Sequence, residues 1–68
     1  MKKVETHVYE VTPEEIRKLP QDTQVLCYDS IYQKYSIIRA KNAMSKSACE
    51  AWGVKYFIFD LPEGYKAV

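Results

Sequence analysis

The sequence predicts a small α+β domain, in which an antiparallel sheet carries two helices on one of its faces. The chain has 68 residues, which is enough for a single domain spanning residues 1–68. Runs rich in β-branched and aromatic residues predict strands at residues 4–11, 24–28, 35–39 and 54–60. Segments of helical composition lie between them, at residues 13–19 and 43–52. The resulting order, β-α-β-β-α-β, is typical of ferredoxin-like folds and also fits a looser two-layer arrangement.

The first strand is predicted from the alternation of side chains over residues 4–11. A single half-exposed strand with this pattern places one set of side chains on each face. One set is Val4, Thr6 and Val8, and the other is His7, Tyr9 and Val11. His7 is then expected to be a surface residue within a strand.

The helix that follows has the clearest local signal in the chain. Thr12 is expected to cap its N-terminus, with Pro13 at the first helical position and Glu15 bonded back to the backbone N–H of Thr12. This arrangement is a capping box. Pro20 ends the helix after about two turns. The inward-facing residues are then Ile16 and Leu19.

Residues 24–28 predict a central strand, because apolar side chains occur on both of its faces. The next segment, residues 31–39, has two interpretations. The β propensity of residues 35–39 favours a hairpin with residues 24–28, with a loop over residues 29–34. Apolar residues in this segment are also spaced as in a helix, which indicates a helix instead. The hairpin is the preferred interpretation.

A second helix is predicted at residues 43–52, followed by Gly53 as the left-handed residue that ends many helices. Its inner stripe is expected at Met44, Ala48 and Ala51. Residues 54–60 then predict a strand that is apolar on both faces. A turn at residues 61–64 and a tail at residues 65–68 complete the chain.

Residue types that carry catalysis do not converge in this sequence. The single histidine, His7, has no nucleophile beside it in the pattern, and the only glycines, Gly53 and Gly64, do not form a phosphate-binding loop. Cys27 and Cys49 lack metal-ligand spacing and are expected to be free thiols that pack as small hydrophobic residues. We therefore predict a protein without catalytic residues, metal or cofactor.

Composition also narrows the class of protein. Apolar residues make up 47% and charged residues 28% of the chain, which is typical of a globular domain. No apolar run approaches the roughly 18 residues that a membrane span needs. The residues after the basic start alternate and do not form the apolar core of a signal peptide. We expect a cytoplasmic protein without a membrane segment.

Charge is distributed unevenly along the chain. Residues 1–29 carry a net charge of −2, residues 30–49 a net charge of +4 and residues 50–68 a net charge of −1, which together give +1. The middle segment has no acidic residue and contains two tyrosines. Such a segment suits an acidic protein surface, and it also suits nucleic acid, since cations pair with phosphates and tyrosines stack on bases. The nucleic-acid alternative places binding at residues 34–46.

Aromatic residues are frequent, with six tyrosines, two phenylalanines and one tryptophan. Helices on one face leave the other face of the sheet open. Tyrosines on that open face would bury a large area against a partner at low entropic cost. The residues expected to contact a protein partner are Tyr32, Lys34, Tyr35, Arg39, Lys41, Lys46 and Tyr56. Pairing of an edge strand across a homodimer is a second route to association.

Three segments form a recognisable series: residues 19–22 (Leu-Pro-Gln-Asp), residues 25–28 (Val-Leu-Cys-Tyr) and residues 56–63 (Tyr-Phe-Ile-Phe-Asp-Leu-Pro-Glu). This series resembles a family of small phage- and prophage-encoded proteins of unknown function. The resemblance implies a small cytoplasmic accessory protein of a mobile element that binds a host protein. The sequence thus predicts a non-enzymatic protein that modulates or inhibits a host protein through an aromatic and basic surface.

Overall fold

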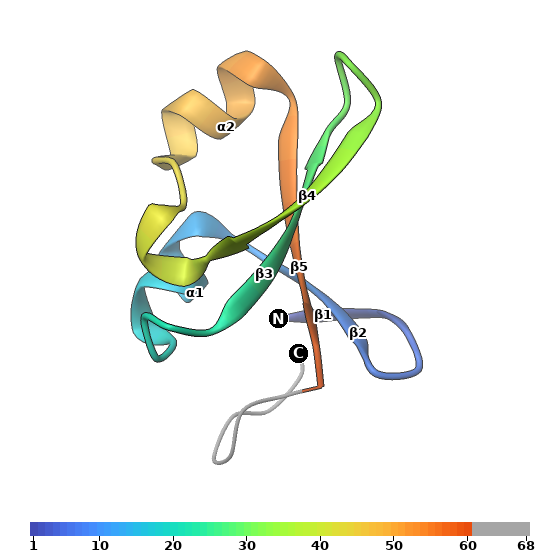
Figure 1. Cartoon of the computed structure of the whole chain (residues 1–68), viewed down its shortest axis with the longest axis vertical. Helices are drawn as coiled ribbons and strands as arrows, with labels where there is room; N and C mark the ends of the chain where they lie inside the picture. Colours follow the sequence, from blue (N-terminus) through green and yellow to red (C-terminus); the bar gives the residue numbers. More distant parts are fainter. Residues whose placement is uncertain (61–68) are drawn as a thin grey trace.

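A computed structural model describes residues 1–60, whose strands form one five-stranded antiparallel sheet (Figure 1). The strands are β1 (Lys2–Glu5), β2 (Val8–Val11), β3 (Gln24–Asp29), β4 (Lys34–Arg39) and β5 (Val54–Phe59). The helices are α1 (Pro13–Lys18) and α2 (Lys46–Trp52), with a short 3-10 turn, η1 (Ala40–Asn42), after β4. The turn and tail predicted at residues 61–64 and 65–68 lie outside the described residues.

The predicted α+β class is confirmed, and the strand order is β1-β2-β5-β3-β4. The last strand, β5, lies in the centre and pairs with β2 on one side and β3 on the other. A ferredoxin-like sheet has four strands, and the first and third of them in chain order are central. When the added edge strand β1 is left aside, the four strands here are β2, β3, β4 and β5. The central ones are the second and the last, β3 and β5, so the fold is the looser two-layer arrangement.

The prediction of one strand over residues 4–11 is wrong. The chain reverses at Thr6 and His7, and β1 pairs with β2 as an antiparallel hairpin. His7 adopts the left-handed conformation with φ 65°. The backbone N–H of Asp60 donates to the carbonyl of His7 at 2.8 Å, and His7 Nδ1 lies 2.6 Å from Asp60 Oδ1. These contacts with the end of β5 hold a turn that contains no glycine or asparagine.

The predicted start of α1 is confirmed. Thr12 Oγ1 accepts the backbone N–H of Glu15 at 3.2 Å, and the backbone N–H of Thr12 donates to Glu15 Oε1 at 2.8 Å. The N-terminal ammonium of Met1 also donates to Glu15. Partial burial opposes ionisation of Glu15, but these hydrogen bonds and the ammonium charge outweigh it and hold the pKa of its carboxyl below the ordinary value.

The hairpin of β3 and β4 is confirmed, and the helical interpretation of residues 31–39 is wrong. Its register is unbroken from Gln24 opposite Arg39 to Asp29 opposite Lys34. The loop is shorter than predicted, at residues 30–33, because Asp29 and Lys34 still pair. Asp29 Oδ1 stabilises the loop by accepting two of its backbone N–H groups.

The second helix is shorter than predicted and turns a different residue inward. Ser45 caps α2 by accepting the backbone N–H of Ala48 at 3.3 Å, so Met44 precedes the helix and is exposed. Cys49 is the buried residue of α2, and Ala51 faces outward. Gly53 ends the helix with φ 65° as predicted.

Both helices and η1 lie on one side of the sheet (Figure 1). We call the side of the sheet that faces the helices the inner face. The core fills the space between this inner face and the helices. Its buried residues are Met1, Val11, Ile16, Leu19, Val25, Ala40, Cys49, Tyr56 and Ile58. Within residues 1–60, neither helix has the length and apolar character required to cross a membrane.

Candidate functional site

The side of the sheet turned away from the helices is its open face. Strand side chains alternate between faces, so residues directly opposite each other in register share a face. Across β5, β3 and β4, Phe57 lies opposite Leu26, and Leu26 lies opposite Ile37. The same face carries two further pairs, Tyr28 with Tyr35 and Val8 with Phe59. We define the open-face patch as Val8, Leu26, Tyr28, Tyr35, Ile37, Phe57 and Phe59.

The open-face patch is apolar, with three exposed residues and four half-buried ones. Tyr35 is 65% exposed, Ile37 58% and Phe59 54%. The ring centroids of Tyr28 and Tyr35 lie 4.6 Å apart, with an angle of 37° between the ring planes. The two rings therefore pack against each other at one end of the patch. Contiguous apolar surface of this kind is typical of an interaction site.

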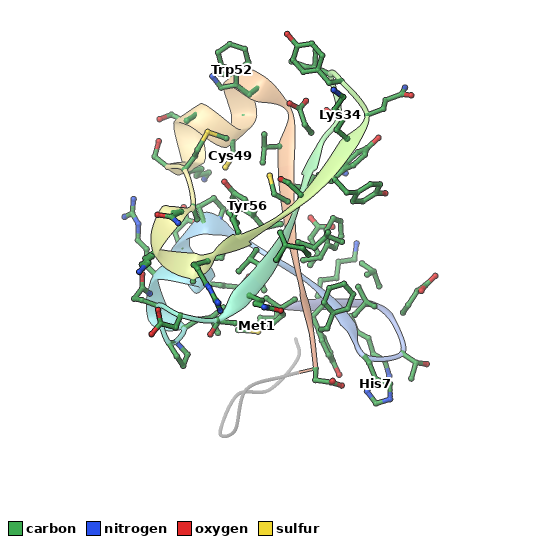
Figure 2. The ribbon with its side chains drawn as sticks, viewed as in Figure 1. Met1, His7, Lys34, Cys49, Trp52 and Tyr56 are labelled. Atoms are coloured by element: carbon green, nitrogen blue, oxygen red, sulfur yellow. The ribbon has the colours of Figure 1, made fainter. Side chains whose placement is uncertain are left out.

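Tyr56, one of the predicted contact residues, belongs to the core and not to the surface. It is 2% exposed, and its hydroxyl accepts the backbone N–H of Met44 at 2.9 Å. Figure 2 shows its side chain between the sheet and α2, below Cys49. Burial raises the pKa of Tyr56 to about 12. The prediction that Tyr56 contacts a partner is wrong, because alternation along β5 directs residues 56 and 58 to the inner face.

The predicted tyrosines of the β3–β4 hairpin are exposed, but they lie in different places. Tyr35 belongs to the open-face patch. Tyr32 is 67% exposed in the loop beyond the end of the sheet. Lys34 and Trp52 lie at this same end of the molecule, and His7 lies at the opposite end (Figure 2).

The predicted basic residues do not come together. Lys34 and Arg39 occupy the two ends of β4, about 17 Å apart at the usual rise per residue. Arg39 Nη1 donates to the backbone carbonyl of Asp22 at 2.9 Å, and Lys41 Nζ lies 3.9 Å from Asp22 Oδ1. Lys46 begins α2, one of the two helices that cover the inner face of the sheet. This spacing does not provide the continuous basic groove that tracks a nucleic-acid backbone.

Of the open-face patch, the predicted contact residues include only Tyr35. Sequence reasoning missed the other six members: Val8, Leu26, Tyr28, Ile37, Phe57 and Phe59. The available signal was the period of two along residues 54–60, which places Phe57 and Phe59 on one face and Tyr56 on the other. Each set is mostly apolar and has one charged residue, Lys55 beside Phe57 and Asp60 beside Ile58. The pattern therefore does not say which set the helices cover.

A hollow of about 400 Å³ lies between α1, α2 and the sheet. Glu14, Lys46 and Glu50 are among its lining residues, and so is the buried Cys49. Cys27 and Cys49 are free thiols, as predicted. Burial raises the pKa of the Cys27 thiol, which disfavours the reactive thiolate. Within residues 1–60, no three His, Cys, Asp or Glu side chains gather to hold a metal ion.

No protein-family model, curated protein or solved structure matches the chain. The resemblance to a family of phage-encoded proteins therefore stays a prediction. Function is inferred from the fold and the surface of the chain itself.

Proposed function

We propose that this chain is a non-enzymatic accessory protein that binds a protein partner through the open-face patch. The observation that supports the proposal is an apolar row running across β5, β3 and β4 that no helix in residues 1–60 covers. A partner that covered this row would remove Tyr35, Ile37 and Phe59 from water. Such burial is the main favourable term in protein association.

The composition of the open-face patch favours a protein partner over nucleic acid. Ile37 and Leu26 offer aliphatic surface, which cannot stack on bases as an aromatic ring does. Charged residues flank the patch and do not interrupt its centre, with Glu10 and Lys55 on the open face beside it. An apolar centre with a polar rim is typical of protein interfaces.

The proposed action of the chain is to occupy a surface of its partner and thereby modulate or inhibit it. A host protein is the partner that the phage-type resemblance predicts. The proposal assigns no catalytic step to the chain, because its buried tyrosine and cysteines serve the core.

The test uses two isoleucines with the same exposure. Ile37 and Ile31 are each 58% exposed, but Ile37 belongs to the open-face patch and Ile31 to the β3–β4 loop. A protein captured from host lysate by the wild-type chain is purified, and its Kd is measured for wild type, Ile37→Ser and Ile31→Ser. Ile37→Ser should weaken binding about tenfold or more, which corresponds to about 1.4 kcal/mol, and Ile31→Ser should leave it within about twofold.

Salt separates the two classes of partner. A complex made by the open-face patch should change little in Kd between low and high salt. A steep loss of oligonucleotide binding with added salt, unaffected by Ile37→Ser, would contradict the proposal and favour binding of nucleic acid by residues 34–46.

A further inference from the structure

The two edge strands of the sheet differ in how well they are protected. Three of the four residues of β1 are charged, and its register with β2 shifts between Lys3 and Glu5. Charged residues and bulges are the devices by which edge strands avoid pairing with other chains. β1 is therefore a protected edge.

β4 has neither a bulge nor a charge along its centre. Its six residues pair with β3 in unbroken register, and its centre is Tyr35-Ser36-Ile37-Ile38. Within residues 1–60 no strand lies beyond β4, so its outer row of backbone N–H and C=O groups faces outward. Such an edge accepts an added strand.

The charges at the two ends of β4 select the kind of strand that fits. Lys34 forms no ion pair among the described residues. Arg39 donates to a backbone carbonyl, that of Asp22, which does not neutralise its charge. Residues 30–49 contain no acidic residue. The edge is therefore apolar in its centre and has a cationic side chain at each end, although Asp29 of β3 lies opposite Lys34.

A second copy of this chain offers no acidic residue in its β4 strand to face Lys34 or Arg39. Opposite charges directly across a strand pair stabilise it. Lys34 and Arg39 therefore favour an added strand with an acidic residue at each end.

We propose that β4 receives an extended segment of the partner protein with acidic ends, so that the segment becomes a sixth strand of the sheet. This inference rests on the proposed function and specifies how the partner binds. The added strand continues the open face, where its side chains lie beside Tyr35 and Ile37.

The test uses synthetic peptides and the whole chain labelled with ¹⁵N. The probe alternates valine and threonine between two terminal glutamates, and a matched peptide has lysines in place of the glutamates. A strand added to an edge points every second N–H toward that edge. Two further glutamate peptides therefore carry N-methyl groups on alternate residues. One of them is methylated at the odd-numbered positions and the other at the even-numbered positions.

The glutamate peptide should shift the backbone amide signals of β4 and leave those of β1 unchanged. Its Kd should be about tenfold lower than that of the lysine peptide. Only one of the two N-methylated peptides should lose binding. The double variant Lys34→Glu with Arg39→Glu should bind the lysine peptide better than the glutamate peptide.

Three results would overturn the inference. Absence of β4 shifts with any peptide at millimolar concentration would remove β4 as a docking edge. Loss of binding by both N-methylated peptides, or by neither of them, would exclude strand addition. Dimerisation of the free chain in sedimentation, with β4 amide signals that shift on dilution, would assign the edge to a second copy. If Ile37→Ser still weakens the partner complex while the peptides fail, the open-face proposal stands without the edge.

Discussion

Consecutive residues of β5 differ in burial, because they face opposite sides of the sheet, although they are similarly apolar. Tyr56 and Ile58 are 2% and 1% exposed and pack under the helices, whereas Phe59 is 54% exposed on the open face. Phe57, between the two buried residues, also faces the open side. The comparison shows that hydrophobicity identifies this strand but does not distinguish side chains that stabilise the fold from side chains available to a partner. The predictions below test that distinction.

The largest expected effect separates two isoleucines on opposite faces of the sheet. Ile58→Ala should lower the free energy of unfolding by about 2–5 kcal/mol, because it leaves a cavity in the core. Ile37→Ala, at a 58% exposed position, should cost less than about 1 kcal/mol. Denaturant unfolding of the two variants measures the difference. Equal losses would show that the open face is covered in the folded protein.

A second effect tests the inner face by alkaline titration. Burial raises the pKa of Tyr56 from 10.0 to about 12, so above pH 10 the unfolded chain loses a proton that the folded chain keeps. The corresponding stability is complete below about pH 10 and is lost as the pH rises through about 12, by roughly 2 kcal/mol.

Tyr56→Phe is the matched control for this titration. It removes the ionisable group, so its stability should fall less steeply than that of wild type across this range. It also removes the hydrogen bond from Met44 N–H, at a cost of about 1 kcal/mol at neutral pH. Identical alkaline profiles for wild type and variant would indicate that Tyr56 is accessible to water.

The smallest effect concerns the helix that covers the inner face. Thr12→Ala removes the hydroxyl that caps α1 and should destabilise the chain by about 0.5–2 kcal/mol. Thr6→Ala, in the exposed β1–β2 turn, is the control and should change the unfolding midpoint less. An unchanged midpoint for Thr12→Ala would mean that the capped start of α1 contributes nothing to covering the sheet.

The features that sequence reasoning predicted well depend on neighbouring residues. The capping box of Thr12 and Glu15, the β3–β4 hairpin and the left-handed Gly53 all follow from short-range chemistry. The β1–β2 turn was missed because a two-residue reversal at Thr6 and His7 keeps the alternation of both flanking strands. No glycine or asparagine marks it, and Asp60, far along the chain, holds it.

The sequence by itself determined where most strands and helices form, since side-chain alternation, capping and turn chemistry act within a few residues. Only the tertiary structure decided that β5 lies in the centre, that Tyr56 is buried while Phe57 and Phe59 face outward, and that Lys34 and Arg39 end at opposite ends of an edge strand. The physical reason is that burial depends on which helix packs over which face. That packing is set by contacts between distant segments, and both faces of the sheet are apolar enough to have been the core.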